Sequence, residues 1–178
     1  MMSTLTDPLF FDTDCLAAFL WVSRENILLQ LFRERMHLPQ HVYQEITRVP
    51  QLKIKTESLI KSKLIFVTQV SADTLEAELY LKLSHNPDPG FKIIGRGEAA
   101  AIALAKCYGG ILCSNNLRDI GPYIQLYELE HKTTGDILVE ALQSNLITEG
   151  QGNMIWNDML SRQRLLPAAS FSDYLANR

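Results

Sequence analysis

The stretch GRGEAAAIALAKCYGGILCSNN, residues 95–116, contains a helix pattern, a break and a strand pattern in close succession. Its alanine-rich part places apolar residues at helical spacing, which predicts a helix over residues 97–108. Two glycines at 109–110 end that helix, and the apolar run after them predicts a strand over 110–114. A helix followed at once by a buried strand is typical of α/β proteins with a parallel sheet.

The same alternation extends along most of the chain, so we expect a single domain over residues 1–178. Its predicted class is a three-layer α/β/α sandwich with a mostly parallel sheet of four or five strands. Strands are predicted at 8–12, 36–39, 64–70, 110–114 and 126–130. Helices are predicted at 14–22, 24–35, 40–48, 51–62, 72–85, 97–108, 116–120, 134–146 and 150–163.

The composition is that of an ordinary folded protein, since 47% of the residues are hydrophobic and 21% are charged. The net charge of −3 argues against the broad basic surface of a non-specific DNA-binding protein, but it is compatible with an acidic metal site. The N-terminal residues lack a signal-peptide pattern, and no apolar run is long enough to span a bilayer. The three cysteines lie in apolar stretches, so we expect reduced thiols and a cytoplasmic location.

Two aspartates follow the first predicted strand, in FFDTDC, residues 10–15. One aspartate at this place is explained by helix capping, because its carboxylate suits the positive end of the helix dipole. A second one so close requires either solvent or a cation. Asp12 and Asp14 therefore indicate a cation site if further acids lie at the same edge of the sheet, where ligands usually bind in such folds.

Two glutamates lie on apolar helix faces. Glu45 shares the face of Val42 and Val49, and Glu98 heads the alanine face of the helix predicted over residues 97–108. A carboxylate turned inward is costly unless it is paired or binds a metal. Structural explanations remain open for both: Glu98 suits the dipole at a helix N-terminus, and Glu45 has the length to reach solvent or His41.

The segment SNNLRDI, residues 114–120, follows the strand predicted at 110–114. Asn115 and Asn116 are both candidates for capping the next helix. Asp119 stands three residues after Asn116, which resembles the acidic member of a capping box. Its place next to a strand end equally suits a metal ligand, so both interpretations stay open.

Taken together, these segments resemble the PIN domain, the small metal-dependent nuclease fold shared by VapC-like toxins and several RNA-processing enzymes. The matching stretches are FFDTDCLAAFL, LPQHVYQEI, residues 95–116 and SNNLRDI, and the resemblance covers about residues 8–130. An asparagine, Asn116, stands where the family commonly has its last aspartate. The resemblance implies acidic catalytic and metal-binding positions at Asp12, Glu45, Glu98 and Asp119.

The resemblance implies a ribonuclease that uses Mg²⁺ or Mn²⁺, because these ions prefer carboxylate oxygen and can activate a water against a phosphodiester. It further implies that the chain is the toxin of a type II toxin–antitoxin pair. Thr13 would contribute a hydroxyl to the water shell of the metal, and Asp14 would either cap the first helix or bind a metal water. The remaining candidates are Asn115 and Asn116 as supporting residues, and Arg96 and Arg118 as phosphate contacts.

Two other functions are compatible with parts of the sequence. Haloacid-dehalogenase-like phosphatases also begin with a strand followed by D-x-D, but their pattern continues with Gly-Thr, whereas this chain has Cys15 and Leu16. A nuclease-inactive PIN-fold interaction module is the second alternative, and Asn116 is the residue that favours it.

Residues 131–178 extend beyond the resemblance and carry two predicted helices with apolar faces. One face contains Ile137, Leu138 and Ala141, and the other contains Met154 and Met159. The two helices either complete the domain or form a groove that binds an antitoxin helix or a second copy of the chain. The expected partners are therefore an RNA substrate, a cognate antitoxin and a second copy in a homodimer, with no membrane.

Overall fold

The structure, a computed structural model, describes residues 6–178, so residues 1–5 of the predicted domain lie outside it. A sheet in the order β3-β2-β1-β4-β5 lies at its centre, and every neighbouring pair of strands in it is parallel. The prediction of a largely parallel sheet in an α/β fold is confirmed. The strands are β1 (Leu9–Phe11), β2 (Met36–Pro39), β3 (Phe66–Thr68), β4 (Ile111–Cys113) and β5 (His131–Lys132).

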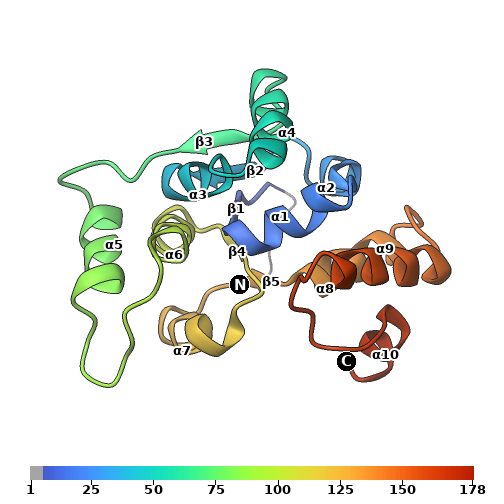
Figure 1. Ribbon diagram of the computed structural model, residues 1–178. Coiled ribbons are helices and arrows are strands. Elements are labelled where there is room, and N and C mark those ends of the chain that lie inside the picture. Colours follow the sequence, from blue (N-terminus) through green and yellow to red (C-terminus); the bar gives the residue numbers. More distant parts are fainter. Residues whose placement is uncertain (1–5) are drawn as a thin grey trace.

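Helices cover both faces of the sheet. In Figure 1, α5, α6 and α7 lie to the left of the strands, and α2, α8 and α9 lie to the right. The helices are α1 (Thr13–Trp21), α2 (Glu25–Phe32), α3 (Gln40–Ile46), α4 (Pro50–Lys61), α5 (Leu75–His85), α6 (Arg96–Tyr108), α7 (Leu117–Tyr127), α8 (Thr134–Gln143), α9 (Glu149–Ser161) and α10 (Phe171–Ala176).

Alternate residues of β1 belong to two different cores. Leu9 and Phe11 pack with α1, α2, α8 and α9, whereas Phe10 packs with residues of α5, α6 and α7. All three side chains are buried, with exposed fractions of at most 1%. A strand buried on both faces reads as a continuous apolar run, which is why β1 was recognisable in the sequence.

The register of β1 and β4 brings two loop residues together. Phe11 pairs with Cys113, so the residues that follow, Asp12 and Ser114, leave the sheet side by side. The backbone N–H of Asp12 donates to the carbonyl oxygen of Cys113 at 2.9 Å. The carboxyl ends of parallel strands meet at one edge, and this edge carries the candidate site.

The predicted strand at 126–130 is wrong, because α7 continues to Tyr127 and β5 begins only at His131. The helix was expected to stop at residue 120, before Gly121 and Pro122. It continues because Tyr123 is 2% exposed in the core and its hydroxyl donates to the carbonyl of Lys92 at 2.6 Å. Tertiary packing here outweighs the cost of an internal proline.

The two predicted C-terminal helices, α8 and α9, turn most of their apolar side chains into the core. Ile137, Leu138 and Ala141 are fully buried, and so is Met159. Met154, which was assigned to the same face as Met159, is 63% exposed. Both helices therefore complete the packing of the sheet, and α10, which was not predicted, packs against α8 and α9.

The helices of residues 6–178 were compared with the length and hydropathy that a membrane span needs. No single helix there is long and apolar enough to cross a bilayer. Helices α1 and α2 together have the length and apolar composition of a membrane span, but the chain bends by 119° between them.

Gly152→Ala is expected to destabilise the protein by about 1–3 kcal/mol, because a Cβ at this position would lie 2.3 Å from Cδ1 of the buried Phe171. The matched control is Gly150→Ala in the same helix, where the nearest atom is 3.9 Å away and a gain of about 0.4–1 kcal/mol is expected. Urea unfolding at equilibrium measures both changes. Equal stabilities of the two variants would contradict the close packing of α10 on α9.

Candidate functional site

Asp12 lies between β1 and α1 and is 2% exposed. It occupies the N-cap position with extended backbone angles, and its Oδ1 accepts the N–H of Cys15 at 2.7 Å. The hydroxyl of Ser114 donates to its other oxygen, Oδ2. Asp12 therefore caps α1 itself, and the interpretation of Asp14 as the cap is wrong, because Asp14 already lies inside the first turn.

Burial raises the pKa of the Asp12 carboxyl from 3.8 to about 7. The hydrogen bonds from Ser114 and Cys15 favour the ionised form but do not compensate for the lost hydration. Nearby negative charge on Asp14 and Glu98 raises the same pKa further. Asp12 is thus a carboxylate that a cation would stabilise strongly in its charged form.

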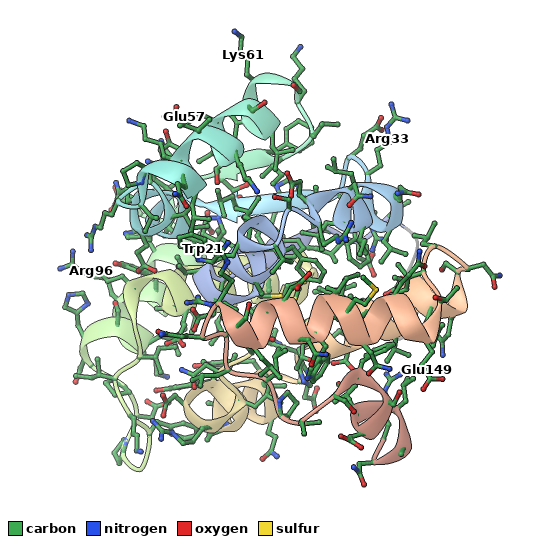
Figure 2. All side chains as sticks on the ribbon, turned by 45° about the vertical axis from the view of Figure 1, so that its right-hand side comes forward. Trp21, Arg33, Glu57, Lys61, Arg96 and Glu149 are labelled. Carbon is green, nitrogen blue, oxygen red and sulfur yellow. The ribbon has the colours of Figure 1, made fainter. Side chains whose placement is uncertain are left out.

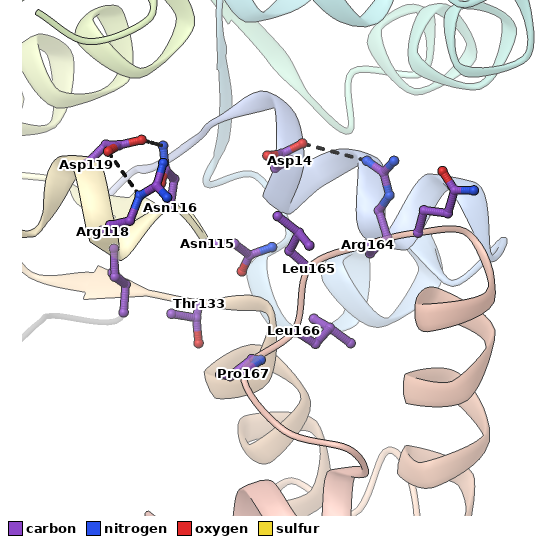
Figure 3. A pocket seen from close by; sticks show the side chains of 12 residues that line it. Asp14, Asn115, Asn116, Arg118, Asp119, Thr133, Arg164, Leu165, Leu166 and Pro167 are labelled. Atoms are coloured by element: carbon purple, nitrogen blue, oxygen red, sulfur yellow. Dashed lines mark hydrogen bonds and ion pairs between the residues drawn. The ribbon is translucent and has the colours of Figure 1, made fainter.

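Asp14 is exposed, with 63% of its side chain accessible to solvent. Its Oδ1 lies 3.7 Å from Nη1 of Arg164, which comes from the connection between α9 and α10. Figure 3 shows this ion pair apart from the hydrogen bonds of Asp119. The two aspartates that adjoin β1 therefore have different surroundings.

Glu45 lies at the meeting point of three helices. Helix α3 carries it, and the hydroxyl of Thr13 at the start of α1 donates to its Oε2. Gly97 of α6 leaves room for its carboxylate, because a Cβ there would lie 2.9 Å from Oε2 and 3.1 Å from Oε1. Glu45 is half-buried and bonds to Thr13. Its charge also acts on His41, where it opposes the lowering of the imidazole pKa by burial and by Arg96.

Glu98 stands at the third position of α6 and makes two kinds of contact. Its Oε2 accepts the N–H of Gly95 at 3.1 Å, as the acid of a capping box does. Its Oε1 accepts the side-chain amide of Asn116 at 2.6 Å. Glu98 therefore lies at the helix N-terminus, where its charge suits the dipole, and also contacts another residue of the site.

Asn116 joins two acids. Its Nδ2 donates to Oε1 of Glu98 and, at 3.0 Å, to Oδ2 of Asp119, and its backbone N–H donates to Oγ of Ser114 at 3.3 Å. The capping-box interpretation of Asp119 is wrong, because its carboxylate meets this amide and not the backbone N–H of the N-cap residue. The hydrogen bond from Asn116, followed by Arg118, lowers the pKa of Asp119.

Asn115 is bonded to α8, whereas the two candidate phosphate-binding arginines are exposed to solvent. Asn115 bonds to the start of α8: its Oδ1 accepts the N–H of Thr134 at 2.8 Å, and its Nδ2 donates to Oγ1 of Thr134 at 2.9 Å. Arg118 is 88% exposed, with Nε 3.4 Å from Oδ1 of Asp119. Arg96 is exposed at the start of α6, and its side chain lies at the edge of the molecule (Figure 2).

Comparison with known proteins places the chain in a family. Residues 9–176 match the family model described as PIN domain (DUF3368). The chain belongs to the PIN domain family. No curated protein matches it. Among solved structures, VapBC-1 from nontypeable Haemophilus influenzae is similar to it with a TM-score of 0.46 and 13% sequence identity, over 71% of this chain and 97% of that chain.

In this PIN domain, hydrogen bonds link acids from three different segments at the carboxyl edge of the sheet. The connection starts on the loop after β1, crosses the turn after β4 and reaches the N-termini of α6 and α7. The linked residues are Asp12, Ser114, Asn116, Glu98 and Asp119. A parallel contact joins Thr13, the neighbour of Asp12, to Glu45.

The donor chemistry of the PIN domain's site suits a hard divalent cation. Its side chains offer carboxylate, hydroxyl and amide oxygens, which Mg²⁺ and Mn²⁺ prefer, and Mg²⁺ is commonly held by one or two carboxylates with its remaining positions filled by water. Over residues 6–178, no group of three or more His, Cys, Asp and Glu side chains is placed to hold one ion. The fit therefore rests on the buried, negatively surrounded carboxylate of Asp12 and on the space that Gly97 leaves beside Glu45.

Two site residues of the PIN domain were missed in the sequence. Ser114 directly follows a buried strand, and its contact with Asp12 depends on the pairing of β1 with β4. Gly97 directly precedes Glu98 inside a helix, where a glycine usually costs stability relative to alanine. That unfavourable residue was the available signal that something approaches the helix backbone closely.

Proposed function

We propose that this PIN domain is a Mg²⁺- or Mn²⁺-dependent endoribonuclease of the cytoplasm and the toxin of a type II toxin–antitoxin pair. PIN domains are generally nucleases. The observation that carries the proposal is the run of hydrogen bonds from the buried carboxylate of Asp12 to Glu98 and Asp119 at the carboxyl edge of the sheet. The family assignment leaves the haloacid-dehalogenase-like phosphatase without support.

The proposed metal-binding residues are Asp12, Glu45, Glu98 and Asp119. The bound ion would activate a water and stabilise the leaving oxygen of the phosphodiester. Ser114 holds one oxygen of Asp12, and Thr13 holds one oxygen of Glu45, so each hydroxyl fixes the direction of a carboxylate. Oriented carboxylates lose less conformational entropy when they bind a charged ligand.

Asn116 sets the spacing of two of these acids. Its single amide nitrogen contacts both Glu98 and Asp119, so it keeps the two carboxylates near each other despite their repulsion. Asn115 supports this arrangement by fastening the turn after β4 to α8. Among the exposed arginines, Arg118 adjoins Asp119 and is the stronger candidate for a phosphate contact, while Arg96 is the first residue of α6, two residues before Glu98.

We further propose a protein antitoxin as the physiological partner, with a homodimer as a second form of association. The exposed side chain of Met154 on α9 is the part of the predicted apolar faces that remains available. Met154 lines a cavity of about 290 Å³ between α2 and α9, together with Ile27, Leu146 and Ile155. We propose that the antitoxin binds at this surface.

The proposed function is tested by incubating the purified protein with end-labelled RNA in Mn²⁺, in Mg²⁺ and in excess EDTA. Cleavage in either metal and none in EDTA is the expected result. Cleavage that persists in EDTA would overturn the metal mechanism. Absence of cleavage under every condition, with a folded protein, would favour the nuclease-inactive interaction module.

Gly97→Ala is expected to reduce RNA cleavage about tenfold, because the new Cβ would displace the carboxylate of Glu45 from Thr13 by a few tenths of an ångström or more. Rates under single-turnover conditions measure the loss. Gly150→Ala, whose Cβ meets only Thr148 at 3.9 Å, is the control and should cleave at the unaltered rate. A Gly97→Ala protein with full activity would argue against a role for Glu45.

A further inference from the structure

A cavity of about 630 Å³ adjoins the hydrogen-bonded acids. One wall is polar and contains Asn116 and Asp119 at the start of α7, and the opposite wall is formed by residues 163–167, between α9 and α10 (Figure 3). This volume lies within the range of about 300–1,000 Å³ that small-molecule binding pockets occupy. The cavity therefore has room for a group of nucleotide size beside the proposed site of hydrolysis.

The wall at 163–167 is held at both ends. Helix α9 ends at Ser161, and Gln163 follows with a φ of 59°. The N–H of Arg164 donates to the carbonyl of Met159 at 3.1 Å. On the far side, the indole N–H of Trp156 donates to the carbonyl of Ala168 at 3.0 Å. These bonds fix the path of the segment on either side of its central residue.

Leu165, at the centre of this fixed segment, is 89% exposed, whereas the next residue, Leu166, packs against the core. In Figure 3 the side chain of Leu165 extends from the segment toward the side of the cavity that Asp14 lines. Single exposed leucines are common on protein surfaces, but one that lines a cavity offers apolar area to a ligand that enters it. Leu165 thus provides an apolar contact without a partner inside the described chain.

Positive charge lies at two sides of the cavity. Arg164 is 25% exposed, with Nη1 3.7 Å from Oδ1 of Asp14, and its Nε donates to the carbonyl of Arg162 at 3.2 Å. The N–H groups of Nη2 are its remaining donors to an anion. Arg118 lines the cavity near Asp119 and is 88% exposed. The cavity therefore combines an apolar contact with guanidinium groups, and arginine binds phosphate through paired N–H donors.

We propose that this cavity is a nucleoside subsite, in which Leu165 contacts the face of a base and Arg164 binds an adjoining phosphate. A nucleotide has a flat apolar face next to an anionic group, and the cavity presents the complements of both at adjacent residues. The inference rests on the proposed ribonuclease function, because the bound nucleotide would be a neighbour of the scissile phosphate.

The test measures RNA binding separately from cleavage. An Asp12→Asn background removes hydrolysis, and fluorescence anisotropy follows a short labelled single-stranded RNA. Leu165→Asn is expected to weaken binding roughly fivefold or more through the lost apolar contact. The control is Leu75→Asn, which changes a 74% exposed leucine on α5 outside the cavity and should leave the affinity unchanged.

A second probe of the same length, built of abasic ribose phosphate, separates the two contacts. Leu165→Asn should have no effect on the affinity for this probe, because the base is missing. Arg164→Gln should weaken binding of both probes about equally, by roughly tenfold, whereas the control Arg33→Gln, on a 75% exposed side chain, should weaken neither.

The outcomes separate this inference from the proposed function. If the wild type cleaves RNA but Leu165→Asn binds and cleaves like Leu75→Asn, the subsite is wrong while the nuclease stands. An equal loss on the abasic probe would also overturn the contact with a base. If the wild type binds RNA with the expected dependence on Leu165 but cleaves nothing in either metal, the proposed function fails and the subsite stands.

Discussion

Asp12→Asn is expected to reduce RNA cleavage by roughly two to three orders of magnitude, because it removes a charge that binds the cation and keeps nearly everything else. Asparagine has the same size, remains a favoured N-cap residue, and can still accept the N–H of Cys15. The hydroxyl of Ser114 donates to Oδ2 of Asp12 in the wild type, and in the variant the side-chain NH₂ of asparagine can donate to the same hydroxyl oxygen instead. The fold should therefore persist.

Single-turnover cleavage in Mn²⁺ measures the loss, and circular dichroism checks that the helices are intact. Asp73→Asn is the matched control: it removes one exposed carboxylate from a loop position with a φ of 60°, which asparagine also tolerates. It should cleave at the wild-type rate. A fully active Asp12→Asn protein would show that the buried carboxylate is structural.

The central strands were predictable because they are buried on both faces. Leu9–Phe11 and Ile111–Cys113 are fully apolar runs bounded by turn or helix signals, so composition alone indicates their state. His131–Lys132 carries no such signal, since it is short and polar and joins the sheet only because its neighbour offers a free edge. Edge strands of this kind depend on tertiary context.

The acids of the site were recognisable for a related reason. Glu45 and Glu98 stand out because a carboxylate among apolar residues needs a partner. The identity of each partner was not recognisable, since Thr13 and Asn116 come from segments that only the folded chain brings near. The pairing of Asp14 with Arg164 is the extreme case, because it joins the first helix to the connection before the last one.

The metal-free protein is expected to lose stability as the pH rises from about 4 to about 7. The pKa of Asp12 is about 7 in the folded protein and near 3.8 in the unfolded chain. Between these values the native state holds a proton that the unfolded state has released, so the free energy of unfolding falls with pH. The difference of about 3 pKa units corresponds to a loss on the order of 4 kcal/mol, complete above pH 7.

Other carboxyls act in the opposite direction, so the Asp12 contribution must be isolated. The pKa values of Asp119 and Asp136 are lowered, and the stability that they contribute is lost as the pH falls through those values. Urea unfolding of the wild type and of Asp12→Asn in EDTA, from pH 4 to 8, gives the difference directly. The free energy of unfolding of Asp12→Asn, relative to that of the wild type, should rise steadily up to pH 7 and remain constant above it.

Adding Mn²⁺ at pH 8 should reverse the order of the two proteins. Without metal, the ionised Asp12 carboxylate destabilises the folded protein, because it has lost its hydration and is repelled by the neighbouring acids. The same negative charge attracts the cation when Mn²⁺ is present. Ligand binding to the native state stabilises it by mass action, and Asp12→Asn would forfeit most of that gain. If Asp12→Asn is the more stable protein in EDTA and the less stable one in Mn²⁺, the burial of this carboxylate serves metal binding; a variant that is less stable in both would assign Asp12 to helix capping alone.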